Sequence, residues 1–291
     1  MKIIKYFFEA LIVYFFFILI RIIGINFGRK ISSKLFLFFG RYIKSEEIIN
    51  KNISYVFKDI SDNDKKKIIK SMWKNYGFTF AEYIYLKKFR ENSFENSHIE
   101  IIGREILDDI IKSKKQVIFV SCHFANFEIM SMELEKYNIN LAAIYRPLNN
   151  YFLNPFMVYL RKNYICKNQI EKGLKGSRKV IDHMSKKHSI ALMVDQRLGE
   201  SERFEFFGKP AHTTTLPAQL SLRFKCNIIP IYLERINEDK FKMEIYKPIE
   251  FNDMRNDKNF RNETTLKINK IMEDMIKKNP HQWIWTHDRW K

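Results

Sequence analysis

Two residues near the middle of the chain have types and spacing suited to acid–base chemistry. His123 follows a short apolar run at residues 117–120, and Glu128 stands five positions after it. A histidine that removes a proton near neutral pH works best when a carboxylate fixes its tautomer and stabilises the imidazolium. The spacing therefore predicts that His123 is a general base and that Glu128 is its orienting carboxylate.

The two side chains can meet only in one local geometry. On one continuous helix, positions five apart point about 140° away from each other, so His123 must precede a helix and Glu128 must lie in its first turns. The residues permit this, because a strand is expected up to Cys122 and a helix from 126 to about 137. The structural alternative is a core histidine at a strand end beside a solvated glutamate.

Two more candidates follow predicted strands. Pro147 favours an extended backbone at Arg146, whose guanidinium could clamp a phosphate or a carboxylate, and Asp195 follows the apolar run 191–194. Ligands of α/β sheets bind at the carboxyl ends of the strands. His123, Arg146 and Asp195 are therefore expected in one site. A solvated loop arginine and a turn-forming aspartate are the alternatives.

Other motifs carry less information about chemistry. The stretch from Phe206 to Thr215 predicts a glycine- and threonine-rich turn that opens a helix, and such a helix start can bind an anion or simply begin the helix. The sequence has no G-x-S-x-G, Walker A or G-x-G-x-x-G motif. His183 and His188 are five apart, which does not suit a zinc pair on a helix, and no metal site is predicted.

The three cysteines are expected to be buried free thiols. Cys122, Cys166 and Cys226 form no C-x-x-C pair, and an odd number argues against a disulfide framework. Cys122 adjoins His123, which raises the possibility of a Cys-His dyad. Neighbours in a strand point to opposite faces, however, and should not hydrogen-bond. A covalent intermediate on Cys122 stays open as an alternative route.

Apolar periodicity predicts the elements that must position these residues. Strand-like and helix-like runs alternate after residue 113, which indicates an α/β fold with a mixed central sheet flanked by helices. Strands are predicted at 116–122, 141–145, 189–194, 227–233 and 241–247. Helices are predicted within 45–90 and at 104–113, 126–137, 150–163, 174–186, 214–224 and 261–279.

The first 28 residues predict a hydrophobic membrane-anchor helix. Residues 6–20 are apolar apart from Glu9, and the apolar pattern resumes after Arg21. This length could span a bilayer or lie in its interface, and the basic residues that follow favour a cytoplasmic body. A buried core helix is the alternative. The rest of the chain, 29–291, is predicted as one domain, largely helical to 113 and α/β from 114.

The charge balance limits the partners. With 51 Lys and Arg against 33 Asp and Glu, the net charge of +18 points to acidic partners. An anionic membrane, an acidic carrier protein and a phosphorylated substrate all fit. Nucleic acid is not expected, because no zinc-finger, RNP or basic-zipper pattern occurs.

Several segments together resemble one known family. The chain is similar, over nearly its full length, to the late (secondary) acyltransferases of lipid A biosynthesis, a branch of the lysophospholipid acyltransferase superfamily. The segments that carry the resemblance are HFANFE at 123–128, YRPLN at 145–149, DQ at 195–196, FFG at 206–208, IPI at 229–231, PHQWIWTHDRWK at 280–291 and NISYVF at 52–57.

The resemblance implies a glycerolipid-acyltransferase-like fold and a reaction. The donor would be an acyl-acyl carrier protein, and the acceptor a hydroxyl of a phosphorylated glycolipid, a lipid A precursor of the Kdo-lipid IVA type. The enzyme would work at the cytoplasmic face of the inner membrane, without a metal or dissociable cofactor. His123 and Glu128 would be catalytic. The implied substrate-binding residues are Arg146, Asn149, Asp195, Gln196, Gly208 and Thr214.

Three alternatives and one undecided residue accompany this interpretation. Within the superfamily, the acceptor could be another glycolipid, a lysophospholipid or an aminolipid. A membrane-associated hydrolase with an unrecognised serine, or a non-catalytic membrane- or nucleic-acid-binding protein, would belong to other classes. Some family members have another basic residue before the aspartate. Lys172, Lys175 and Arg178 are all candidates for it here.

Overall fold

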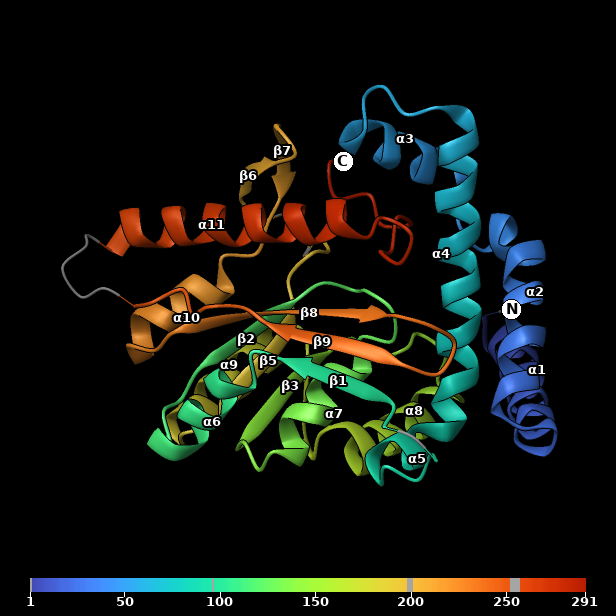
Figure 1. The fold of residues 1–291 in the computed structure, drawn as a ribbon, viewed down its shortest axis with the longest axis horizontal. Helices are drawn as coiled ribbons and strands as arrows, with labels where there is room; N and C mark the ends of the chain where they lie inside the picture. Colours follow the sequence, from blue (N-terminus) through green and yellow to red (C-terminus); the bar gives the residue numbers. More distant parts are fainter. Residues whose placement is uncertain (1, 96, 198–200, 252–256) are drawn as a thin grey trace.

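A seven-stranded mixed sheet forms the centre of the protein. The computed structural model describes residues 2–95, 97–197, 201–251 and 257–291. The strand order is β1-β9-β8-β2-β5-β3-β4, and β8 and β9 pair antiparallel whereas the other pairs are parallel (Figure 1). The mixed α/β architecture predicted from the sequence is thereby confirmed. The strands are β1 Ile99–Ile102, β2 Ile118–Ser121, β3 Leu141–Tyr145, β4 Asn168–Glu171, β5 Ser189–Met193, β8 Ile228–Arg235 and β9 Phe241–Ile245.

Helices cover both faces of the sheet and extend from one end of it (Figure 1). Their bounds are α1 Lys2–Ile23, α2 Ile25–Ile43, α3 Glu46–Val56, α4 Asp62–Glu82, α5 Leu86–Arg90, α6 Arg104–Ser113, α7 Glu128–Lys136, α8 Asn154–Leu160, α9 Leu174–Ser185, α10 Leu216–Phe224 and α11 Asp257–Lys278. A 3₁₀ turn, Tyr83–Tyr85, follows α4, and a π-helical turn, Arg161–Ile165, follows α8. From residue 104 onward, the helices match the ranges expected from apolar spacing to within a few residues. The predicted anchor helix ends at Ile23 and not at residue 28, and α2 starts at Ile25.

The central strand β2 separates two hydrophobic clusters. Ile118 and Val120 pack with residues of α9, α10 and α11, whereas Phe119 packs with residues of α6 and α7. All four residues of β2 are buried, as expected for a parallel strand covered on both faces. The strand is thus held rigidly, and so is the position of the residues that follow it.

Helix α4 connects the N-terminal helices to the sheet. Its N-cap is Ser61, whose hydroxyl accepts a hydrogen bond from the Asp64 backbone N–H at 3.1 Å. Gly77 lets α2 approach closely, because a Cβ added there would lie 2.5 Å from the Ser33 backbone. The helical region before the sheet is therefore packed against it through α4 (Figure 1).

The structure corrects the interpretation of the glycine- and threonine-rich segment. Residues 203–212 form an antiparallel hairpin, β6 Arg203–Phe206 and β7 Lys209–His212. Its two turn residues, Phe207 and Gly208, both have positive φ, 54° and 69°. This is the turn that suits the twist of a two-residue hairpin. Gly208 therefore serves the hairpin, and α10 begins eight residues later at Leu216.

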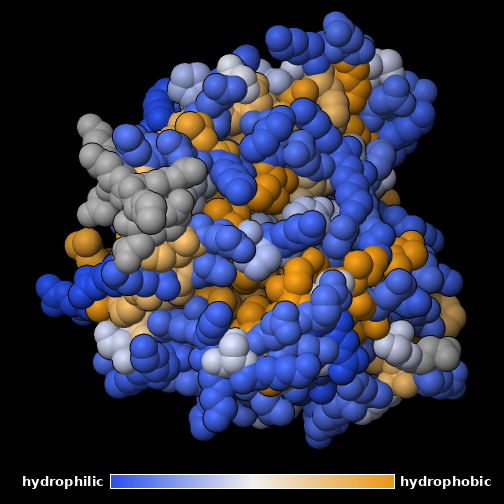
Figure 2. All heavy atoms as spheres, turned by 60° about the vertical axis from the view of Figure 1, so that its left-hand side comes forward, coloured by the Kyte–Doolittle hydropathy of each residue, from blue (hydrophilic) through white to orange (hydrophobic). Residues whose placement is uncertain are grey.

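Helix α1 is the one element, within the described residues, that is long and apolar enough to cross a membrane. It has 22 residues, and only 17% of its most apolar window is buried. Elsewhere the surface is more polar. On the face shown in Figure 2, hydrophilic residues form most of the outline and apolar residues show mainly as a band across the middle.

Candidate active site

His123 and Asp195 meet at the carboxyl edge of the sheet. His123 comes two residues after the end of β2, and Asp195 two residues after the end of the neighbouring β5. The His123 ring Nδ1 lies 2.7 Å from Asp195 Oδ1, and the His123 backbone N–H donates to Asp195 Oδ2 at 2.9 Å. The sequence predicted that these two residues would share a site, but not that they would be bonded.

The Asp195 carboxyl group keeps its negative charge although it is buried. Asp195 is 1% exposed. Burial alone would raise the pKa of its carboxyl group, but the attraction of His123 and the hydrogen bonds from His123 and Trp283 outweigh burial and lower the pKa to about 2. Asp195 is therefore ionised at neutral pH, and it accepts the Nδ1–H of His123. That tautomer leaves His123 Nε2 with a free lone pair.

Glu128 has a different partner from the one expected. Its Oε1 accepts hydrogen bonds from Arg161 Nε at 2.9 Å and Nη2 at 2.6 Å, and from the Tyr83 hydroxyl at 2.7 Å. Among the described residues no hydrogen bond joins Glu128 to His123. The prediction that Glu128 orients the His123 ring directly is therefore wrong, because the carboxylate bonded to that ring is Asp195.

The backbone between the two residues explains this arrangement. Ala125 has a positive φ of 46°, so the chain turns sharply after His123. Helix α4 holds this turn, because Asn75 and Thr79 both donate to the Ala125 carbonyl, at 3.2 and 3.1 Å. Glu128 then starts α7 and meets the cation of Arg161.

A cavity of about 280 Å³ adjoins His123 and Glu128. It lies at the carboxyl ends of β3, β4 and β5 and continues between α7 and α9. Much of its wall is apolar, and includes Met130, Ala143, Ile165, Ile170, Val180 and Leu192. A cavity with an apolar part beside His123 can accommodate an apolar ligand.

Several predicted binding residues line this cavity and others do not. Arg146, Lys172 and Gln196 contribute to its wall together with His123 and Glu128. Burial and the neighbouring Arg146 both lower the pKa of Lys172. The cavity wall does not include Asn149, Gly208, Thr214, Lys175 or Arg178. Asp195 does not line the cavity itself, but its hydrogen-bond partner His123 does. Thr214 has a local partner, since its hydroxyl accepts the Leu216 backbone N–H at 3.3 Å.

Arg161 is a cavity residue that the sequence analysis missed. It is 7% exposed, and its Nη1 is buried with no hydrogen-bond partner in the described structure. It begins the π-helical turn after α8, a feature concentrated at functional sites. In the sequence, Arg161 lies within a predicted helix and looks like any surface arginine, so no local signal marks it. Its free donor can serve a bound anionic oxygen.

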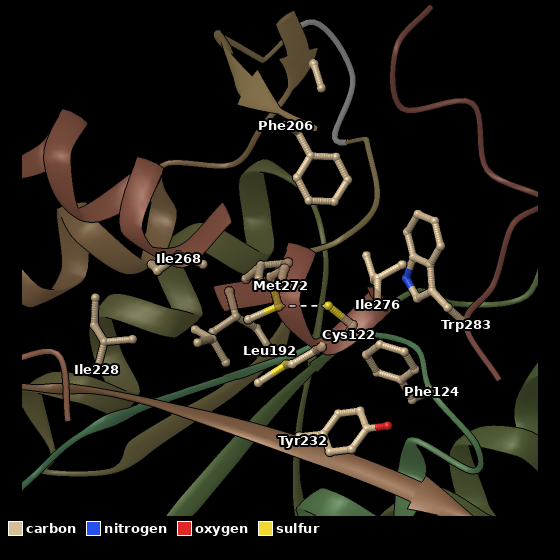
Figure 3. Packing of buried hydrophobic residues seen from close by; sticks show 14 of the residues in the cluster. Cys122, Phe124, Leu192, Phe206, Ile228, Tyr232, Ile268, Met272, Ile276 and Trp283 are labelled. Atoms are coloured by element: carbon tan, nitrogen blue, oxygen red, sulfur yellow. Dashed lines mark hydrogen bonds between the residues drawn. The ribbon is translucent and has the colours of Figure 1, made fainter. Parts of the chain in front are cut away.

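Cys122 points away from this chemistry. Its thiol is fully buried among apolar side chains and hydrogen-bonds to Met272 Sδ (Figure 3). Burial raises the pKa of the thiol well above its usual range, and the charge of Asp195 raises it further. A thiolate nucleophile is therefore disfavoured. Within the described residues, no group of three or more His, Cys, Asp or Glu side chains could hold a metal ion.

Comparisons with known proteins show the family of this chain. The family model described as bacterial lipid A biosynthesis acyltransferase matches residues 1–291. A lipid A biosynthesis lauroyltransferase from Escherichia coli (strain K12) is 25% identical over 259 residues, which cover 86% of this chain and 81% of that enzyme. The chain belongs to the bacterial lipid A biosynthesis acyltransferase family, and it is a transferase.

Proposed function

We propose that this enzyme transfers a fatty acyl chain from acyl-acyl carrier protein to a hydroxyl of a lipid A precursor of the Kdo-lipid IVA type. His123 would act as the general base in a single step. The observation that carries the proposal is the His123–Asp195 pair, whose free Nε2 adjoins a largely apolar cavity. The family supports acyl transfer in lipid A synthesis, and the pair supplies a chemical route.

The proposed step begins at the acceptor hydroxyl. His123 Nε2 takes its proton as the oxygen forms a bond to the thioester carbonyl carbon. The carbon–sulfur bond then breaks, and the His123 imidazolium returns the proton to the leaving thiolate. The ionised Asp195 stabilises the imidazolium that forms. Such a base contributes on the order of 10²–10⁴ in rate.

Arg161 is placed to stabilise negative charge on the reacting group. The Nε–Nη2 edge of its guanidinium is held by Glu128 and Tyr83, so its orientation is set before substrate binds. The unpaired Nη1 is a buried donor on a residue of the cavity wall, and charge-assisted bonds are strong away from bulk water. We assign to Arg161 Nη1 the role of donor to the thioester carbonyl oxygen. Glu128, which was expected to orient His123, is assigned the positioning of Arg161.

The cations at the cavity suit acidic substrates. Arg146 is exposed, and Lys172 lies beside it. A phosphorylated sugar and an acidic carrier protein are both attracted to such a cluster. Arg146 and Lys172 are proposed to bind acceptor phosphate or the carrier, and helix α1 to hold the enzyme at the cytoplasmic face of the inner membrane.

The test is acyl transfer by detergent-solubilised enzyme from a radiolabelled acyl-carrier thioester to a Kdo-bearing tetraacylated lipid A precursor. His123→Ala is run in parallel, with His281→Ala as the control because His281 is exposed. A product with one more acyl chain, lost in His123→Ala and kept in His281→Ala, is the expected result.

Three outcomes would change the proposal. Transfer by folded His123→Ala at the wild-type rate would remove His123 as the base. Transfer to a lysophospholipid, another glycolipid or an aminolipid, but not to the lipid A precursor, would replace the acceptor. Release of free fatty acid without an acceptor would indicate a hydrolase.

A further inference from the structure

A tryptophan from the C-terminal segment completes the coordination of Asp195. Trp283 stands 88 residues after Asp195 in the chain, and its indole N–H donates to Asp195 Oδ2 at 2.8 Å. The indole is 2% exposed. A buried hydrogen bond to an ionised carboxylate is among the strong ones.

The three hydrogen bonds to Asp195 are not equivalent. Oδ1 accepts from the ring of His123, and Oδ2 accepts from the backbone of His123 and from Trp283. Within the described residues, Trp283 is thus the one donor that does not belong to His123. Without it, the carboxylate would be tied only to the residue that it has to orient. The indole therefore fixes the His123–Asp195 pair to the rest of the protein.

Trp283 is itself held rigidly. A backbone bridge pairs it with Phe124, the residue after His123. Its ring packs edge-on against Trp285 at 4.7 Å between centroids and contacts Phe206. Figure 3 shows Trp283 among the buried residues of the same cluster as Cys122 and Ile276. A donor fixed in this way can hold the carboxylate plane without a cost in side-chain ordering during the reaction.

We infer that Trp283 is a positioning residue for catalysis, which acts through Asp195 on His123. The inference rests on the proposed base role of His123. It assigns the C-terminal segment a part in turnover, beyond its part in covering the core.

The test compares Trp283→Phe with Trp290→Phe in the full-length enzyme. Both changes keep an aromatic ring and delete one buried indole N–H. Trp290 donates to the Phe206 carbonyl and not to Asp195, so Trp290→Phe is the matched control. Trp283→Phe is expected to lower kcat about tenfold with KM for donor and acceptor nearly unchanged. Trp290→Phe should keep the wild-type kcat.

A spectroscopic measurement keeps the inference testable if Trp283→Phe folds poorly. The chain has four tryptophans, whose indole N–H signals can be followed by ¹⁵N NMR. Asp195→Asn should move the Trp283 signal upfield, because a neutral acceptor replaces the carboxylate, whereas Glu128→Gln should leave it in place.

Three results would each overturn the inference. One is a folded Trp283→Phe with the wild-type kcat, and another is a loss of kcat in Trp290→Phe as large as that in Trp283→Phe. The third is a Trp283 indole signal that does not move in Asp195→Asn. Failure of the proposed function is distinguishable from this. If His123→Ala keeps full activity, the base assignment fails. If His123→Ala is inactive and Trp283→Phe is normal, only the positioning role fails.

Discussion

At the scale of single residues, the partner of His123 is decided by strand pairing and not by closeness in sequence. Asp195 is 72 positions away, yet β2 and β5 are parallel neighbours and bring both residues to one edge. Glu128 is five positions away and turns to Arg161, 33 positions further on. Two carboxylates thus hold two different partners, the His123 ring and the Arg161 guanidinium.

The Glu128–Arg161 pair should behave as one unit. Glu128→Gln and Arg161→Gln are each expected to lower kcat by about tenfold or more, because the first change weakens the hold on the guanidinium and the second removes the guanidinium. The double variant should be little worse than either single one. Steady-state kinetics of the cycle checks this, with melting curves to exclude unfolding. Additive losses would show that the two residues act separately.

Cys122 should be dispensable for turnover. Burial raises the pKa of its thiol, so Cys122→Ser is expected to keep kcat within about threefold while losing some stability in the core. Single-turnover assays with labelled donor should detect no acyl-enzyme. A stable acyl adduct on Cys122 would contradict the direct mechanism.

His287 should make the C-terminal segment sensitive to acid. Its Nδ1 accepts the Arg197 backbone N–H at 3.4 Å, and burial lowers its pKa below the usual value. In the unfolded chain, the His287 ring takes up a proton as the pH falls through about 6.5. In the folded chain, it takes up this proton only at a lower pH. The contribution of His287 to the free energy of unfolding is therefore complete above the pKa of the unfolded chain, and it declines as the pH falls toward the lower pKa of the folded chain.

Thermal melts between about pH 7.5 and 5.5 test this linkage, since that range spans the usual histidine pKa. The wild-type Tm should fall more than the Tm of His287→Gln, whose side chain does not titrate. Equal falls in the two proteins would remove His287 as the cause.

At the scale of elements, α4 connects the N-terminal helices to the turn after His123. Glu82, at the end of α4, is fully buried and bonds Arg29 of α2, Arg235 of β8 and Asn126 of the turn. Attraction of the two arginines and the hydrogen bonds lower the pKa of Glu82 against the effect of burial, which alone would raise it. Stability and site geometry therefore depend on the same carboxylate.

Removing this carboxylate should be costly. Glu82→Gln leaves the buried Arg235 guanidinium without its carboxylate partner and leaves Arg29 paired only with the exposed Asp239, so a loss of about 3–5 kcal/mol in the free energy of unfolding is expected. The control is Glu91→Gln, since Glu91 pairs with Lys87 on an exposed surface, where a pair contributes about 0–1 kcal/mol. Denaturant unfolding of both variants measures the difference. A Glu82→Gln protein as stable as Glu91→Gln would contradict the role of the network.

The elements that the sequence analysis missed are those with the least local signal. Strands β1 and β4 have four residues each and form the two edges of the sheet. Residues of an edge strand face solvent, so Asn168 and Gln169 of β4 show no apolar pattern. The inner strands β2, β5 and β8 are nearly continuously apolar because both of their faces are buried, whereas β9 alternates buried and half-buried residues, and both patterns are visible in the sequence. The β6–β7 hairpin was missed because its turn lacks the usual Asn-Gly or Asp-Gly pair.

At the scale of the whole molecule, α1 and the loop after Arg146 form one apolar surface. The Tyr6 carbonyl accepts a hydrogen bond from Asn150 at 2.8 Å, and the Tyr14 hydroxyl donates to the Phe152 carbonyl at 2.8 Å. Tyr151 is 72% exposed beside α1. Apolar side chains on α1 and this loop are exposed: Ile3, Ile4, Phe7, Phe8, Leu11, Ile12, Phe15, Ile18, Ile22, Leu148, Tyr151 and Phe152. A patch of this size suits a bilayer surface near the cavity.

Vesicle binding should depend on this surface. Phe8→Ser with Phe15→Ser is expected to weaken binding to anionic phospholipid vesicles by at least about tenfold, since burial of each ring contributes about 1.5–3 kcal/mol. The control is Ile236→Ser with Leu266→Ser, which removes two exposed apolar side chains outside the surface. Co-sedimentation reports both. Equal binding by the two double variants would exclude α1 as the contact.

The sequence by itself determined the order of most elements, the mixed α/β class and the place of His123 at a strand end. Each of these follows from periodicity, which records locally whether a side chain is buried. Membership of the family followed from short motifs. Only the tertiary structure decided that Asp195 bonds His123, that Arg161 faces the cavity and that Trp283 completes the pair. Those contacts join residues 33 to 88 positions apart. They depend on how strands pair and helices pack, which no local pattern records.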